Sequence, residues 1–264
     1  MFKKICFLLF LVCGLAACHK QEADQRQDIR FAVAQAPINL DPRYATDAAS
    51  ARVNRLIYRS LVGFDAASKP IAALASWQVI SPTQYRFKLG EAGRRFHDGS
   101  PLTAKDVQAT YESLLALKDS PLFAEIFNIS RIQSLDDNTL DFYLNAADSA
   151  FPAKLIIGIL PAAQIATGRD FSHHPLGSGP LAFERWTNTL QLKRVADSQV
   201  ITLLEVKDPT VRILKLMRGE VDMLQGDLPP ELVRYLKDQP SIKVSETNGA
   251  NFSYLGFNLQ DKTL

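Results

Sequence analysis

The sequence predicts an α/β fold in which helices pack against a largely parallel sheet. Residues 200–244 alternate strand and helix patterns in the order strand–helix–strand–helix–strand. Parallel strands need a crossover connection, so this order indicates parallel pairing with helices on the sheet faces. The chain has 264 residues and is 47% hydrophobic, which is enough for one large packed domain or two small ones.

The first 17 residues have the layout of a secretory signal. Lys3 and Lys4 precede an apolar run, and Cys18 follows that run directly. The run is shorter than the roughly 20 apolar residues that span a bilayer, so residues 1–17 are predicted to be a signal peptide outside the fold. The other two cysteines lie inside this signal, which leaves Cys18 as a lone thiol. Residues 18–27 are polar and charged, and they are interpreted as a flexible tether.

The charge balance argues against a nucleic-acid partner. Once the signal is removed, the 30 basic side chains fall to 28, which equals the number of acidic ones. A nucleic-acid binder concentrates a basic excess on one face, whereas both signs alternate along this chain. The longest later apolar segment, 155–166, contains Gly158 and Pro161 and is too short to span a membrane.

The folded part is predicted to begin with a strand, a loop and a helix. Ile29, Phe31 and Val33 alternate with polar or small residues, which is typical of a strand. The prolines of residues 37–44 break this strand into a loop. Residues 48–61 carry apolar side chains at helical spacing and predict a helix.

The middle of the chain predicts two hairpins that flank a helix. Thr103 is expected to begin this helix, because Asp106 can reach back to it in an acidic variant of the capping box. Alternating apolar residues and turn residues predict the other elements. These are strands at 77–80 and 85–89 with a turn at 81–83, a turn at 96–100, and a hairpin over 132–144 that turns at 136–138.

The last third supplies the strands and helices of the α/β pattern. Asp208 and Pro209 give an N-cap followed by proline, and Gly219 gives a left-handed cap, so a helix lies between them. Val211, Leu214 and Met217 have helical spacing. The other predicted elements are strands at 181–186, 190–195, 200–206, 221–224 and 242–244, and a helix at 230–237.

Six short segments, in one order along the chain, together form a specific pattern. They are Asn39-Leu40-Asp41-Pro42; Leu74-Ala75-Ser76-Trp77; the run from Tyr85 through Phe96-His97-Asp98-Gly99-Ser100 to Val107; Gly177-Ser178-Gly179-Pro180; Gly219-Glu220-Val221-Asp222; and Tyr254-Leu255-Gly256-Phe257-Asn258. In this order they resemble the extracellular solute-binding proteins of family 5, the dipeptide-, oligopeptide- and nickel-binding proteins of ABC importers. The resemblance covers essentially residues 28–264.

That resemblance implies a periplasmic-binding-protein-like fold of type II, whose two lobes close on a ligand by hinge motion. Residues 28–58 and 171–258 would form the first lobe, and residues 59–170 a β-rich subdomain. Residues 259–264 would begin the crossover to a second lobe. Family members run roughly twice this length, so the second lobe is expected to be missing.

Leu15-Ala16-Ala17-Cys18 resembles the lipobox of bacterial lipoproteins. The resemblance implies cleavage before Cys18 and a lipid on its thiol. The protein would then be exported and held at a membrane surface, in the periplasm or on the cell surface. The alternative is an ordinary signal peptide with an incidental cysteine.

The function implied by the family is a substrate-binding component of an ABC importer. It would capture short peptides or a related small solute and deliver them to a permease, without catalysis, metal or cofactor. The residues expected to face the ligand are Leu40, Asp41, Pro42, Arg43 and Tyr44, together with Gly177 and Ser178.

Two histidine-containing motifs admit a functional and a structural interpretation. His97 and Asp98 resemble a catalytic base with its orienting acid, but the following Gly99 favours a turn. His173 and His174 suggest a metal site. Adjacent residues in an extended chain point opposite ways, so surface histidines are expected instead.

The Gly177-Ser178-Gly179 segment resembles part of a phosphate loop or a nucleophile elbow. Both need a strand before and a helix after, whereas Pro180 and a strand follow here, so a tight glycine turn is expected.

Two alternative functions remain. One is an exported serine hydrolase that uses Ser178 with His173 or His174. The other is a truncated or repurposed lipoprotein without a transport role, which the sequence downstream of Leu264 would distinguish.

Overall fold

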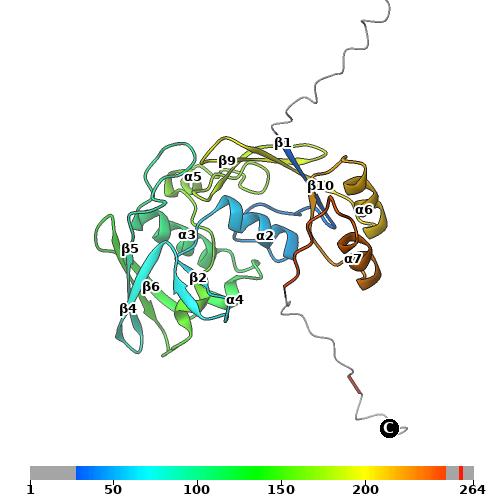
Figure 1. Ribbon diagram of the computed structural model, residues 1–264. Coiled ribbons are helices and arrows are strands. Elements are labelled where there is room, and N and C mark those ends of the chain that lie inside the picture. The colour runs from blue at the N-terminus through cyan, green and yellow to red at the C-terminus, as the bar shows by residue number, and fades with distance from the viewer. Residues whose placement is uncertain (1–27, 248–255, 258–264) are drawn as a thin grey trace, which may run out of the picture. The chain divides into compact units, whose positions relative to one another are not determined.

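The computed structural model of the protein describes residues 28–247 and 256–257 (Figure 1). These residues fall into two compact units that divide between Gly226 and Asp227. In the second unit the helix is α7 (Pro230–Lys237), as predicted. The helices and strands of the first unit are β1 (Asp28–Val33), α2 (Ala48–Ile57), β2 (Val62–Phe64), β3 (Pro70–Ala72), β4 (Ala75–Ser81), β5 (Gln84–Leu89), α3 (Ala104–Ala116), α4 (Phe123–Ile126), β6 (Ile129–Ser134), β7 (Thr139–Leu144), the 3₁₀ helix η1 (Phe151–Lys154), α5 (Ala162–Ala166), β8 (Leu181–Trp186), β9 (Leu190–Arg194), β10 (Val200–Glu205), α6 (Pro209–Met217) and β11 (Met223–Leu224).

The larger sheet confirms the predicted α/β pairing. Its strand order is β11-β1-β10-β9-β8, and β1 runs parallel to both of its neighbours. Helix α6 therefore carries the chain from β10 across β1 to β11, as expected for a crossover. The Asp208 carboxylate accepts from the Val211 N–H at 2.8 Å, and Gly219 has φ +65°, so both predicted ends of this helix are confirmed.

The β-rich part of the chain is an antiparallel sheet with the strand order β4-β5-β7-β6. Both predicted hairpins are present, and β5 joins them by pairing with β7. Helix α3 begins after Thr103, whose backbone N–H and hydroxyl both donate to the Asp106 carboxylate at 2.7 and 2.9 Å. The predicted capping interaction thus starts this helix, and its apolar face is buried against the sheet.

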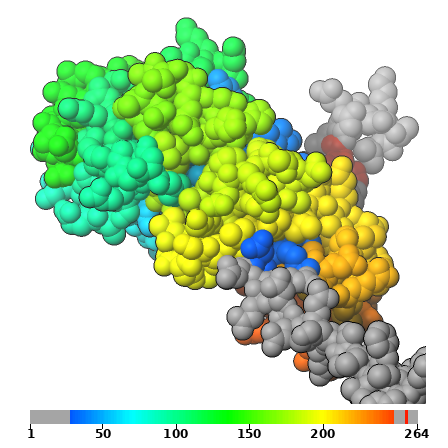
Figure 2. Space-filling view, turned by 90° about the horizontal axis from the view of Figure 1, so that it is seen from above, coloured from blue at the N-terminus to red at the C-terminus, as the bar shows by residue number. Residues whose placement is uncertain are grey.

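Two hydrophobic cores lie in the first unit. One is built from residues 61–159 and includes the edge-to-face ring pairs that join Phe142 to Phe87, Tyr111 and Phe151. The other is built from residues 40–58 together with residues 160–203. In Figure 2 the cyan and green surface of residues 61–159 forms one block, and the yellow-green and yellow surface of the residues that follow forms another block beside it. Helix α2 lies between the β-rich part and the larger sheet (Figure 1).

Helix α2 ends four residues earlier than predicted. Tyr58 is extended, with φ −114° and ψ 157°, and the helix stops at Ile57. The carbonyl of Ile57 accepts from the Gly179 N–H at 2.8 Å, so a distant loop satisfies this helix end. The helical spacing of Leu61 misled the prediction, because Leu61 packs in the core of residues 61–159 and not on the helix face.

Two other features of the last third differ from what the patterns suggest. The predicted strand at 242–244 is wrong: these residues are irregular, and no strand of the described chain pairs with them. The three apolar residues that predicted α6, namely Val211, Leu214 and Met217, are exposed, whereas Ile213 is buried.

No helix among the described residues combines the length and apolarity that a membrane span requires.

Candidate functional site

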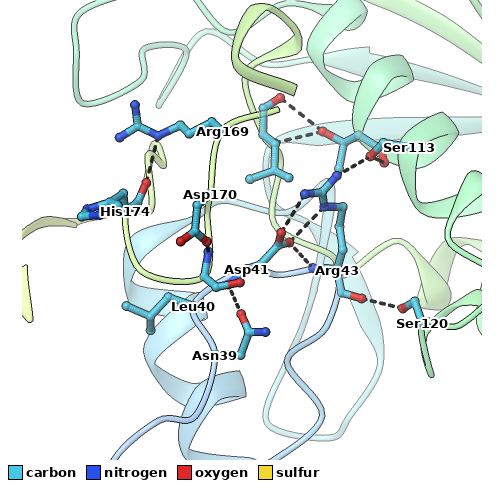
Figure 3. Close-up of polar contacts among 12 residues, drawn as sticks. Asn39, Leu40, Asp41, Arg43, Ser113, Ser120, Arg169, Asp170 and His174 are labelled. Atoms are coloured by element: carbon cyan, nitrogen blue, oxygen red, sulfur yellow. Dashed lines mark hydrogen bonds and ion pairs between the residues drawn. The ribbon is translucent and has the colours of Figure 1, made fainter. Parts of the chain in front are cut away.

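The predicted ligand-facing loop contains a buried ion pair between Asp41 and Arg43 (Figure 3). The Arg43 Nε and Nη2 atoms donate to the two Asp41 oxygens at 3.0 and 2.7 Å, and the Arg43 backbone N–H donates at 2.9 Å. The side chains are 13% and 4% exposed. Each charge of the loop is therefore already satisfied inside the protein.

The same loop ties the two cores together. Arg43 Nη1 donates to the Ser113 hydroxyl of α3 at 3.2 Å, and the Ser120 hydroxyl donates to the Arg43 carbonyl at 2.5 Å. The Tyr58 hydroxyl donates to the Leu40 carbonyl at 3.1 Å, and burial raises the pKa of Tyr58. The Leu40 side chain is fully buried in the core of residues 40–58 and 160–203. These contacts make residues 39–44 a structural joint.

Gly177 and Gly179 bring a second segment against the end of α2. A Cβ atom on Gly177 would lie 2.0 Å from the Ile57 carbonyl oxygen, and one on Gly179 would lie 2.4 Å from the Leu56 carbonyl oxygen. Neither glycine has a positive φ. The expected glycine turn is thus corrected: these glycines are required by close approach to a helix end and not by a left-handed conformation.

His97 fastens this segment to the turn at 96–100. Its backbone N–H donates to the Gly177 carbonyl at 2.9 Å, and its Nε2 lies 3.0 Å from the Gly179 carbonyl. A carbonyl only accepts, so Nε2 carries the proton in the neutral ring. The Nδ1 atom is buried without a partner in the described chain, and burial lowers the pKa of His97. The predicted turn is confirmed, and His97 serves as its anchor.

The residues of the hydrolase hypothesis are not assembled into a triad. The Ser178 hydroxyl is buried and has no hydrogen-bond partner within the described residues. His173 and His174 are exposed, as predicted, and His173 Nδ1 lies 3.0 Å from an Asp170 oxygen. A nucleophilic serine needs an imidazole within hydrogen-bond reach.

In the part of the chain that is described, no group of three His, Cys, Asp or Glu side chains could hold a metal ion.

A hollow of about 340 Å³ lies beside α2, and we call it the α2 hollow. Its wall includes Asn54, Arg55 and Tyr58 of the helix and its C-cap, Arg59, residues 156–158 and Pro180. Most of the remaining wall is small or apolar. Of the predicted ligand-facing residues, only Pro42 belongs to this wall.

The polar groups of the α2 hollow contrast with those of the joint. The charged side chains in its described wall, Arg55 and Arg59, are both cationic. Arg59 Nε donates to the Ser178 carbonyl at 3.0 Å, whereas the exposed Arg55 side chain forms no hydrogen bond or ion pair with the described residues. Asn54 is 7% exposed, and neither atom of its amide has a partner in the same part of the chain. No local motif marks these residues, so the sequence does not predict them.

The profile of the bacterial extracellular solute-binding proteins, family 5 Middle, matches residues 68–264. Among curated proteins, the glutathione-binding protein GsiB of Pectobacterium atrosepticum is 29% identical over 89% of this chain and 49% of its own length. The di/tripeptide-binding protein 1 of Pseudomonas aeruginosa is 28% identical over 86% of this chain and 49% of its length. The chain thus spans about half the length of the curated relatives that it matches.

Solved structures show the same partial coverage. MoaA of A. tumefaciens R10, in complex with mannopinic acid, is 24% identical with a TM-score of 0.73, over 81% of this chain and 48% of its own. The periplasmic binding protein DppA of Helicobacter pylori, in complex with the peptide STSA, is 23% identical with a TM-score of 0.70, over 81% and 49%. The fold is therefore periplasmic-binding-protein-like.

Proposed function

This chain belongs to the bacterial extracellular solute-binding proteins of family 5, and from that membership we propose that it captures short peptides or a related small solute for an ABC importer. It would work outside the cytoplasm and deliver its ligand to a permease. The residues described here would form one wall of the ligand groove.

The observation that carries the proposal is the parallel arrangement of β10, β1 and β11. In open α/β sheets, ligands bind outside the carboxyl ends of parallel strands, where the following loops meet. The ligands for which relatives and structural neighbours are named include glutathione, di- and tripeptides and the peptide STSA. Short peptides are the chemistry that these share, since glutathione is itself a tripeptide.

We keep residues 40–44 with Gly177 and Ser178 as proposed ligand-facing positions. Within this set Leu40, Asp41 and Arg43 would act through their main chains, because the Leu40 side chain is buried and the other two side chains bond to each other. The Ser178 hydroxyl is buried and has no partner among the described residues, and a polar ligand that reached it would supply the missing hydrogen bond. Main-chain contacts suit a binder of varied peptides, because every peptide offers the same backbone groups.

We further propose that residues 1–17 are removed and that Cys18 carries a lipid; both lie outside the described residues. Labelling cells with a fatty acid tests this directly. The parent protein should take up label and the Cys18→Ala variant should not. Label on the variant would contradict the anchor.

Two measurements test the capture of peptides. Deleting the gene in its own bacterium should lower the uptake of a labelled tripeptide, and a plasmid copy should restore it; unchanged uptake would contradict the transport function.

In calorimetry, the 264 residues alone should bind di- to pentapeptides more weakly than micromolar, because a single wall buries only one side of a ligand. Micromolar binding would contradict the need for a second wall.

A further inference from the structure

We propose that the outer side of α6 contacts a lipid bilayer, with Val211, Leu214 and Met217 in the headgroup region and the cations Lys215 and Arg218 on anionic lipids. We call these five side chains the α6 face. The inference rests on the proposed lipid anchor, because that anchor would keep the protein at a membrane. None of the proposed ligand-facing residues belongs to the α6 face, so the contact is separate from the capture of a ligand.

Three apolar side chains of α6 lie outside the core of the first unit. Val211, Leu214 and Met217 are between 38% and 45% exposed, and their spacing of three residues places them along one side of the helix. Single exposed apolar residues are common on protein surfaces and need no explanation. Three on one side of a nine-residue helix form a stripe, which is typical of a helix that lies in a membrane interface.

The stripe faces outward because buried groups fix the orientation of α6. Arg212 and Ile213 are the buried residues of this helix. Arg212 Nη1 donates to the carbonyls of Val206 and Lys207 at 2.7 and 2.9 Å. A rotation of the helix that buried the stripe would break these two hydrogen bonds and expose Ile213. The exposure of the stripe is therefore a property of the fold.

The cations of the α6 face suit anionic headgroups. Lys215 Nζ lies 2.6 Å from one oxygen of Glu220, and Arg218 Nη1 lies 3.8 Å from the other oxygen of that carboxylate. Two cations thus share one acid, which leaves an excess positive charge beside the stripe. The residues 209–217 of α6 include no Asp or Glu. Cations next to an apolar stripe add electrostatic attraction to anionic lipids.

The position of the predicted tether favours a bilayer as the partner of this face. Arg30 of β1 donates through Nη2 to the Gly219 carbonyl at 2.7 Å, so the start of β1 lies next to the end of α6. In Figure 2 the blue surface of β1 lies beside the golden surface of the α6 region. Residues 18–27 would join the lipid on Cys18 to Asp28, and such a segment spans at most about 35 Å. The anchor would therefore keep the α6 face close to the bilayer.

Fluorescence quenching by brominated lipids tests the contact. Residues 18–264 hold a single cysteine, so a thiol-reactive phospholipid can couple Cys18 to vesicles of brominated phosphatidylcholine and phosphatidylglycerol. Leu214→Trp adds a tryptophan to the α6 face, and Phe127→Trp adds one at an exposed position of the β-rich part. The bromine should quench the fluorescence added at 214 and leave that added at 127 unchanged. The parent gives the signal of the two native tryptophans, which is subtracted.

Three results would overturn the proposal. The first is a tryptophan at 214 that fluoresces as in water. The second is one that is shielded from water but not quenched, because a second copy of the chain or a further segment of protein would then cover the face. The third is equal quenching at 214 and 127, which would show that the protein has no preferred orientation on the vesicle.

Paired charge variants test the cations. Lys215→Gln together with Arg218→Gln, in the Leu214→Trp protein, should reduce the quenching on vesicles that contain phosphatidylglycerol. Lys88→Gln together with Arg131→Gln removes two exposed cations of the β-rich part and should have no effect. Equal losses in the two double variants would refute the role of the α6 cations.

The chemical coupling separates this proposal from the anchor on which it rests. The vesicle result does not depend on whether the cell attaches a lipid to Cys18, which fatty-acid labelling of the Cys18→Ala variant tests. Peptide uptake is measured in a third experiment. Failure of the α6 contact, of the anchor and of the transport function are therefore distinguishable.

Discussion

The joint at residues 39–44 and the α2 hollow lie beside the same helix, yet they use their polar groups in opposite ways. In the joint, Asp41 and Arg43 bond to each other and to neighbouring elements. In the hollow, the side chains of Asn54 and Arg55 have no hydrogen-bond or ion-pair partner among the described residues. Satisfied polar groups hold a structure together, whereas a buried polar group without a partner destabilises it. The same helix is therefore stabilised by its polar neighbours on one side only.

The largest expected effect comes from filling the space between the segment 177–179 and the end of α2. Gly177→Ala would place a Cβ atom 2.0 Å from the Ile57 carbonyl oxygen, so the segment or the helix end must move. We expect the free energy of unfolding to fall by about 3 kcal/mol or more, measured by urea denaturation. Gly90→Ala is the control, because its Cβ would have no neighbour closer than 3.7 Å. A Gly177→Ala protein as stable as this control would contradict the close approach.

Breaking the ion pair of the joint tests the comparison itself. Asp41→Ala leaves the largely buried Arg43 guanidinium without its carboxylate, which should cost about 3 kcal/mol of unfolding free energy. Arg55→Gln, at the exposed wall of the hollow, should change the same quantity by less than about 0.5 kcal/mol. Similar losses in the two variants would remove the distinction between the joint and the α2 hollow.

Most of the fold was predictable because its signals are local. Capping residues and alternating side chains predicted the start of α3 and both hairpins correctly. The end of α2 was not predictable from helical spacing, since it depends on Gly179, more than a hundred residues later. The irregular residues 242–244 show that an apolar pattern forms a strand only where a neighbouring strand pairs with it.

The site was harder to predict than the fold. Asp41 and Arg43 were expected to face the ligand because of the family resemblance, and only the structure shows that their side chains bond to each other. The α2 hollow joins α2 to residues 156–158 and Pro180. Such a wall has no local pattern, and the lack of a partner for Asn54 is a three-dimensional property.

A smaller effect is expected from His97, which anchors the segment 177–179 to the turn at 96–100. Burial lowers its pKa below 6.5, whereas the unfolded chain takes up a proton near that ordinary value. Stability from the neutral ring is thus complete above pH 6.5 and is lost as pH falls toward the lowered pKa. Because a single proton is involved, the slope of this dependence stays below about 1.4 kcal/mol per pH unit.

His97→Gln should flatten this dependence in urea denaturations between pH 7 and pH 5. The exposed His174, whose ring makes no hydrogen bond in the described chain, gives the control His174→Gln, and the slope of this variant should match that of the parent. Asp98 opposes the shift by favouring the charged ring. An unchanged slope in His97→Gln would show that this imidazole titrates alike in both states.

The smallest effect on stability is expected from Asn54→Leu, and the informative result is whether the free energy of unfolding rises or falls. Asn54→Leu replaces a buried amide without partners by an apolar side chain of similar size, which removes the cost of an unsatisfied polar group. We expect the free energy of unfolding to stay the same or to rise by up to about 1 kcal/mol. The reason is that a leucine of similar size has no hydrogen-bonding group to leave unsatisfied. Urea denaturation of the variant and the parent measures the difference. A clear loss of stability in Asn54→Leu would show that the amide is satisfied in the folded protein.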